Sequence, residues 1–244
     1  DSPDVAGLPD LRMLCLRLIL VALQRSGTSL AANDSYVEVI QRVVCKSLIK
    51  NCASCVEDHA MLSLGTNCIQ TLLVMMPHAM KAHIQTFFHF VVLRLLESKK
   101  TSTECHDILI EFLVDVLNKP DFTLFLYVNF DCDRHCQDLF ERLVKFLCKS
   151  SFTDSTNPFS KRCLDCLIAV LRDMESRNTR ADFGEFQQVE AEKIKKRRLQ
   201  TACEHFNRDP KKGFQYLQHV GIFSSPLVDH EVAMFFRHTS GLDK

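Results

Sequence analysis

The chain has 244 residues, of which 46% are hydrophobic, 25% are charged and only seven are glycine. Thirty basic residues balance thirty acidic ones, so charge gives no argument for a nucleic-acid or anionic-membrane ligand, and we expect no nucleic-acid partner. Polar residues interrupt every apolar run before it is long enough to span a bilayer.

Twelve cysteines are spread through the chain rather than gathered into a small, disulfide-rich framework. Five of them fall within apolar helical patterns and are predicted to be small buried hydrophobes: Cys15, Cys45, Cys68, Cys148 and Cys203. Free thiols in this number indicate a reducing compartment, so we expect a cytoplasmic protein. Because the chain does not begin with Met, we also expect it to be a piece of a longer protein.

Apolar residues at helical spacing predict five helices before residue 120. Their predicted ranges are 8–26, 34–50, 56–76, 77–97 and 103–118. In the first helix the inward positions are predicted to be Leu11, Leu14, Cys15, Leu18 and Ala22. Gly27 is a stop signal for that helix, and Pro120 closes the fifth.

Residues 121–128 are almost entirely apolar, which fits either a buried strand or a short buried helix. We favour the helix because no partner strand is recognisable elsewhere in the sequence. Two further helices are predicted over residues 135–149 and from Pro158 to about Met174. Helices of this length joined by short loops predict an all-α fold, in which antiparallel hairpins form an α-solenoid of armadillo or HEAT type.

Residues 176–185 lack an apolar stripe and are predicted to be a linker between two domains, which span residues 1–175 and 186–244. The second domain begins with a charged helix over residues 186–207. Its inward positions are predicted to be Val189, Ile194, Leu199, Cys203 and Phe206. Asp209-Pro210 and Ser225-Pro226 are start signals for two shorter helices, which end near residues 219 and 238.

A polar box, Tyr127-Val-Asn-Phe-Asp-Cys-Asp133, interrupts the apolar pattern. Its five candidate contact residues are Asn129, Phe130, Asp131, Cys132 and Asp133. One interpretation is a structural corner, in which Asp131 or Asp133 caps a helix that begins near Arg134. The other is a contact surface for another domain, because ordered polar loops often carry interaction residues. We expect Asp131 to be structural and Asp133 to be the cap or an exposed contact.

Two Cys-x-x-Cys pairs, at Cys52 and Cys163, have the spacing of zinc ligands, and His59 lies near the first. The second pair lies within a helical pattern, where such residues simply share a face, so we assign neither a metal nor any other cofactor. No phosphate-binding loop, nucleophile motif or paired carboxylate is present, and no catalytic residue is assigned. The basic run 193–198 fits a localisation or phosphate patch, but we favour a solvated helix face.

Two stretches carry a resemblance to a known family. The box, followed by Leu139-Phe-Glu-Arg-Leu-Val144, resembles the box that names the "homology upstream of Sec-seven" region of the large Arf guanine-nucleotide exchange factors. The stretch Phe206-Asn-Arg-Asp-Pro-Lys-Lys-Gly-Phe-Gln-Tyr-Leu217 resembles the opening of their Sec-seven domain. The two occur in the family's order. Residues 11–24 and 81–98 look like the trans-Golgi, brefeldin-A-inhibited branch.

The resemblance implies a regulatory region of an exchange factor that activates Arf GTPases while bound peripherally to Golgi membranes. It implies contact with the dimerisation region that precedes this segment in the family. The family's catalytic glutamate and switch-opening groove match no residue of this chain, so the chain itself is expected to be non-catalytic. An unrelated helical-repeat adaptor and, less favoured, a metal-binding protein are the alternative interpretations.

Overall fold

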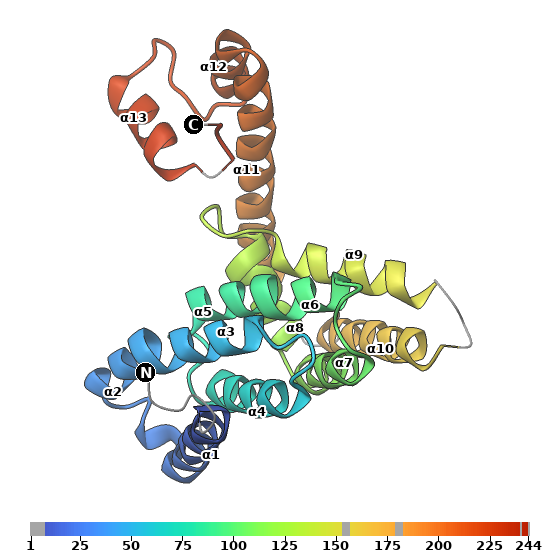
Figure 1. The fold of residues 1–244 in the computed structure, drawn as a ribbon. Helices are drawn as coiled ribbons and strands as arrows, with labels where there is room; N and C mark the ends of the chain where they lie inside the picture. The colour runs from blue at the N-terminus through green and yellow to red at the C-terminus, as the bar shows by residue number, and fades with distance from the viewer. Residues whose placement is uncertain (1–7, 153–156, 179–182, 240, 244) are drawn as a thin grey trace, which may run out of the picture. The chain divides into compact units, whose positions relative to one another are not determined.

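The computed structural model describes residues 8–152, 157–178, 183–239 and 241–243. Every regular element within these ranges is a helix, as predicted, and none is a strand. The structure divides into two compact units (Figure 1). The first comprises residues 1–122 and 143–174, and the second comprises residues 123–142 and 175–244. The segment that contains the box therefore groups with the C-terminal helices, which the predicted domain boundaries did not anticipate.

The first unit is built from neighbouring helices in an α-solenoid-like arrangement (Figure 1). Its helices up to residue 122 are α1 (Leu8–Ser26), α2 (Asp34–Val39), α3 (Lys46–Ala53), α4 (His59–Met75), α5 (Lys81–Phe87), α6 (Arg94–Glu97) and α7 (Thr103–Leu117). A short 3-10 helix, η2 (Gly27–Ser29), follows α1. The π-helical turns η3 (Ile40–Cys45) and η4 (Phe88–Leu93) join α2 to α3 and α5 to α6, so each pair reads as one longer helix. Helix α4 contacts α1, α3 and α7.

Helix α1 has the predicted bounds but faces the opposite way. Leu16 and Leu23 are buried, whereas Leu11, Leu14 and Leu18 are 54–61% exposed. The expected inward stripe is thus the outward one, and Cys15, predicted to be buried, is exposed as well. Leucines lie on both sides of this helix, so periodicity does not reveal which side is buried, and for that reason the prediction was wrong.

Residues 122–131 form the expected short helix, not a strand. Helix α8 (Phe122–Leu126) continues directly into the π-helical turn η5 (Tyr127–Asp131). Helix α9 (Leu139–Ser151) starts four residues later than predicted, and α10 (Pro158–Asn178) extends beyond the predicted end at Met174. Of the predicted linker, residues 179–182 lie outside the described ranges, while the residues on either side are helical.

The remaining helices belong to the second unit: α11 (Phe183–Arg208), α12 (Pro210–His219) and α13 (Asp229–His238). Asp209 caps α12 as predicted, its side chain accepting a hydrogen bond from the Lys211 amide. The three helices share an apolar core built around Ala202, Cys203, Leu217, Phe223 and Phe235. Ile194, predicted to face inward, is 43% exposed.

Candidate functional site

The box lies at a π-helical turn. The amide of Cys132 donates a 3.0 Å hydrogen bond to the carbonyl of Tyr127, five residues earlier. Phe130 is fully buried and packs edge-on against Phe125, and the side-chain amide of Asn129 donates to the Phe125 carbonyl at 2.9 Å. Single π-turns occur mostly as insertions within α-helices and often at functional sites. The box is therefore anchored to the helix that precedes it.

Asp131 caps helix α9 from a distance along the chain. Its carboxylate accepts hydrogen bonds from the amides of Phe140 at 2.8 Å and Glu141 at 3.0 Å. Only 1% of Asp131 is exposed. Its structural role is as expected, but it caps the helix that starts at Leu139 rather than one near Arg134. The negative charge also suits the positive end of the helix dipole.

Asp133 forms a local turn instead of a helix cap. Its side chain accepts a hydrogen bond from the amide of His135 at 2.8 Å, an arrangement typical of aspartate in loops. Asp133 is half-buried, as is Asn129, whereas Phe130, Asp131 and Cys132 are buried. Asp133 was expected to be either the cap of the next helix or an exposed contact; Asp131 has the capping role, and the contact role of Asp133 stays a prediction.

Helix α11 inserts Lys193 into a group of carboxylates. Its Nζ atom donates a 2.8 Å hydrogen bond to Asp138 Oδ1 and lies 3.6 Å from Asp131 Oδ1 and 3.8 Å from Glu141 Oε2. It also lies 5.9 Å from the centre of the Tyr127 ring. Lys193 is 5% exposed. Burying an ammonium group this deeply is costly unless anionic groups surround it, and here three carboxylates do.

Lys196, one turn further along α11, holds the backbone of the box. Its Nζ atom donates a 2.7 Å hydrogen bond to the carbonyl of Phe130 and lies 2.8 Å from Asp138 Oδ1. Gln200 completes the contact by donating to Asp138 Oδ2 at 3.0 Å. One carboxylate, Asp138, thus binds three side chains of α11. We call the six side chains of this contact the lysine–carboxylate cluster: Asp131, Asp138, Glu141, Lys193, Lys196 and Gln200.

The cluster shifts the pKa values of its two most buried carboxylates in opposite directions. Burial opposes ionisation of Asp138, but hydrogen bonds from Gln200, Lys193 and Lys196 outweigh it and lower its pKa to about 2. Burial raises the pKa of Asp131 and is only partly offset by the two α9 amides and Lys193. Asp138 is thus the firmly ionised centre of the cluster.

The cluster corrects our interpretation of the basic run. Lys195, Arg197 and Arg198 are exposed, as expected of a solvated face, but Lys193 and Lys196 are buried. Residues three apart share one side of a helix, so that side of α11 is cationic and inward. The partners of these lysines lie more than fifty residues away, and charge spacing within the run gives no sign of them.

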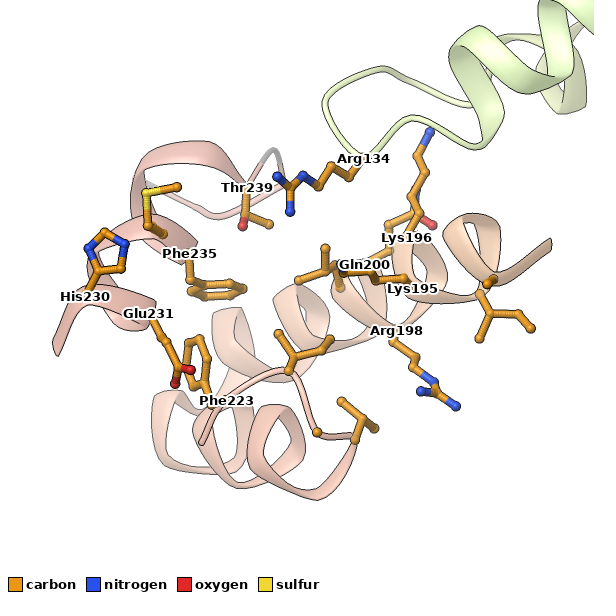
Figure 2. A pocket seen from close by; sticks show the side chains of 17 residues that line it. Arg134, Lys195, Lys196, Arg198, Gln200, Phe223, His230, Glu231, Phe235 and Thr239 are labelled. Carbon is orange, nitrogen blue, oxygen red and sulfur yellow. The ribbon is translucent and has the colours of Figure 1, made fainter. Parts of the chain in front are cut away.

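A groove of about 720 Å³ lies beside the cluster, along α11 and α13 (Figure 2). Its apolar lining includes Ile194, Leu199, Ile222, Phe223, Met234 and Phe235. Exposed Arg134, Lys195 and Arg198 add positive charge to its edge. Figure 2 shows the Lys196 side chain extending away from the groove towards the box segment. No pattern in the sequence predicted this groove.

The four cysteines of the two pairs are buried in the structure. Within the described ranges, no three His, Cys, Asp or Glu side chains are arranged to hold a metal ion. Cys52 and Cys55 are buried, and burial raises the pKa of Cys55 to about 12 and that of Cys52 further still. Such thiols stay protonated and behave as small core residues, which weakens the metal-binding interpretation.

Comparison with known proteins gives two matches in the order expected. The family described as "Mon2/Sec7/BIG1-like, HUS domain" matches residues 9–139, and the Sec7 domain family matches residues 195–244. Asp131 and Asp138 lie within the first match, Lys196 lies within the second, and Lys193 lies two residues before it. The lysine–carboxylate cluster therefore joins the end of one family region to the beginning of the other.

The curated relatives are large exchange factors. ARF guanine-nucleotide exchange factor GNOM of Arabidopsis thaliana is 30% identical over 274 residues, covering all of this chain and 19% of the relative. GNL1 of the same plant is also 30% identical. Brefeldin A-inhibited guanine nucleotide-exchange protein 1 of Homo sapiens is 24% identical over 309 residues, covering all of this chain and 16% of the relative. The chain thus spans less than a fifth of the length of these proteins.

Proposed function

This chain belongs to the family of large Arf guanine-nucleotide exchange factors with a HUS and a Sec7 domain, and from that we propose that it is a regulatory scaffold segment of such a factor. The parent protein would activate Arf GTPases in Golgi vesicle traffic. The ordered family matches favour this over an unrelated helical-repeat adaptor. The sequence identity is 24% to the human relative named for brefeldin A inhibition and 30% to GNOM. We retain the trans-Golgi branch as part of the proposal.

One observation carries the proposal. The lysine–carboxylate cluster connects the box, at the end of the HUS match, to the helix that opens the Sec7 match. A buried, charge-paired contact is costly to break by removing one partner. We therefore assign this segment the role of holding the first helix of the exchange domain to the upstream region.

We further propose that the 244-residue chain alone has no exchange activity. In the family, the catalytic glutamate and the groove that opens the GTPase switch regions lie further along the Sec7 domain than the part matched here. None of the described residues matches either feature. The Arf GTPase would be a partner of the parent protein rather than of this segment.

The proposed partner of this segment is the dimerisation region that precedes it in the family. The exposed face of α1 supports this, because Leu11, Leu14 and Leu18 form an apolar stripe that a neighbouring helix would bury. Within the box, Asn129 and Asp133 are the two contact candidates that are only half-buried. Phe130, Asp131 and Cys132 are covered by this chain itself, so a partner would reach the box through the other two.

A peripheral association with Golgi or trans-Golgi membranes, from the cytoplasmic side, completes the proposal and follows the family. Among the described helices, none is both long and apolar enough to cross a bilayer.

The test compares two longer proteins: the Sec7 domain alone, and the same domain preceded by this segment. Nucleotide exchange on an Arf GTPase is followed by fluorescence, with and without liposomes. A regulatory segment changes the exchange rate several-fold in one of these conditions, in either direction. Equal rates in all conditions would overturn the regulatory role.

A further inference from the structure

Helix α11 makes two chemically different contacts within the second unit. Towards α12 and α13 it buries Ala202 and Cys203 in an apolar core that also contains Leu217 of α12 and Phe235 of α13. Towards the box segment, residues 123–142, its hydrogen bonds and ion pairs are centred on Lys193 and Lys196. One helix thus belongs to a permanent apolar core at one end and to an ionic contact at the other.

The two kinds of contact respond differently to separation. Apolar surfaces that separate must be rehydrated at full cost, so such contacts persist. Ammonium and carboxylate groups lose their partners on separation but regain strong hydration, and the two terms are of similar size. A contact made of such groups is therefore suited to opening and closing, provided that the geometry is good when closed.

From this contrast we infer that the lysine–carboxylate cluster is a reversible latch between the box and the first half of α11. The inference rests on the proposed regulatory function and names the groups through which it would act. Lys193 and Lys196 are positioning residues of the latch. Asp138 is its shared acceptor, because its Oδ1 atom lies 2.8 Å from both ammonium groups.

The geometry makes the latch cooperative. Withdrawal of α11 separates Asp138 from Lys193, Lys196 and Gln200 at once, because all three project from the same side of that helix. The same movement releases the Phe130 carbonyl from Lys196. Partial opening would leave a charged group buried without its partner, which costs more than either end state. The contact therefore has two favoured states, closed and fully open.

The box does not need the latch in order to stay folded. Asp131 is held by the amides of Phe140 and Glu141, which belong to the same chain segment. Asn129 is likewise held by Phe125. These bonds survive when α11 withdraws, so the open latch presents a formed box and a capped α9. Opening of the latch can therefore be distinguished from local unfolding of the box, because only unfolding would break these bonds.

The test is amide hydrogen exchange on the 244-residue chain. The latch variant carries Lys193→Met and Lys196→Met, which remove both ammonium groups and keep most of the side-chain length. The control carries Lys195→Met and Arg198→Met, at exposed positions on the same helix. A second latch variant, Asp138→Asn, weakens the same contact from the other side without touching α11.

Both latch variants are expected to exchange about tenfold faster in residues 187–200, where the latch holds α11. The amides of Phe140 and Glu141, and those of the α12–α13 core, keep their wild-type rates. The control variant matches the wild type throughout. No acceleration in residues 187–200 would overturn the latch, and so would equal acceleration across α11, α12 and α13, because the cluster would then be part of one cooperative core.

The latch and the proposed regulatory function can be disproved independently of each other. In the longer protein that contains the complete Sec7 domain, the latch variants are assayed for nucleotide exchange on Arf. A local hydrogen-exchange effect with an unchanged nucleotide-exchange rate would leave the latch standing and would argue against the regulatory role. An unchanged hydrogen-exchange pattern would overturn the latch, whatever the rate of nucleotide exchange.

Discussion

The ammonium group of Lys196 donates a 2.7 Å hydrogen bond to the carbonyl oxygen of Phe130, 66 residues earlier in the chain. The lysine is 3% exposed and the phenylalanine is fully buried. A charged donor on a buried backbone acceptor fixes the box by its main chain, independently of the box side chains. The identity of residue 130 therefore matters for packing, while its carbonyl makes the contact with α11.

The cap at Asp131 predicts a stability effect. Replacing Asp131 with Ala leaves the amides of Phe140 and Glu141 without their acceptor and should lower the unfolding free energy by roughly 1–2 kcal/mol. Asp131→Asn keeps an acceptor and should cost less. Urea denaturation measures both. A loss in the alanine variant no greater than that of Asp165→Ala, on the exposed face of α10, would contradict the cap.

The lowered pKa of Asp138 predicts a pH dependence. Because its pKa falls from 3.8 to about 2 on folding, its contribution to stability is complete above about pH 4 and is lost as the pH falls from about 4 to 2. The stability difference between wild type and Asp138→Asn should therefore be constant near neutral pH and shrink below about pH 4. Denaturation curves between these limits measure it, and a pH-independent difference would rule out the shift.

Because α11 and α12 approach closely, we predict that position 213 must be glycine. A Cβ atom at Gly213 would lie 2.6 Å from Phe206 Cβ and 2.7 Å from Phe206 Cα. Gly213→Ala should therefore destabilise the second unit by roughly 1–3 kcal/mol, although alanine is the better helix former. Gln215→Ala, at an exposed site on the same helix, should be close to neutral. A gain in melting temperature for the glycine variant would show that the helices are further apart.

The two faces of α1 predict opposite phenotypes. Leu16→Ala empties a buried site and should cost about 2–4 kcal/mol in unfolding free energy. Leu14→Asp, on the exposed stripe, should leave the melt of this chain nearly unchanged but weaken binding to the preceding dimerisation region supplied in trans. A thermal melt beside a pull-down separates the two effects. Binding that survives at Leu14→Asp would remove α1 from the proposed interface.

The proposal that this segment has no exchange activity of its own predicts an inert chain. The 244-residue chain should leave the rate of nucleotide release from an Arf GTPase at its uncatalysed value. A fluorescent-nucleotide assay over a range of protein concentrations measures this. A rate that rises in proportion to added protein would contradict the prediction.

Helical periodicity was sufficient to place most elements. The bounds of α1 and α12 were predicted correctly because stop and start signals, Gly27 and Asp209-Pro210, flank them. The start of α9 was missed because its cap, Asp131, lies eight residues before the first helical residue instead of next to it. Capping rules describe neighbours in sequence and do not reach that far.

Only one side of the candidate site, the box, was predicted from the sequence. The box was recognised, and Asp131 was expected to be structural. The contact between the box segment and Lys193 and Lys196 was not expected. A basic run has the same sequence pattern whether its lysines are solvated or paired with buried carboxylates. Burial of such groups depends on partners supplied by the fold, which local spacing does not encode.

Neighbouring residues of the box serve different helices: Phe130 gives its carbonyl to α11, while Asp131 gives its carboxylate to α9. A genetic scan of the box and of the helix that contacts it should therefore return two classes of allele. Substitutions at position 131 should be temperature-sensitive, because they weaken the start of a helix. Substitutions at positions 193, 196 and 138 should form the second class, because each weakens the contact with α11 and leaves the hydrogen bonds from Asp131 to α9 in place.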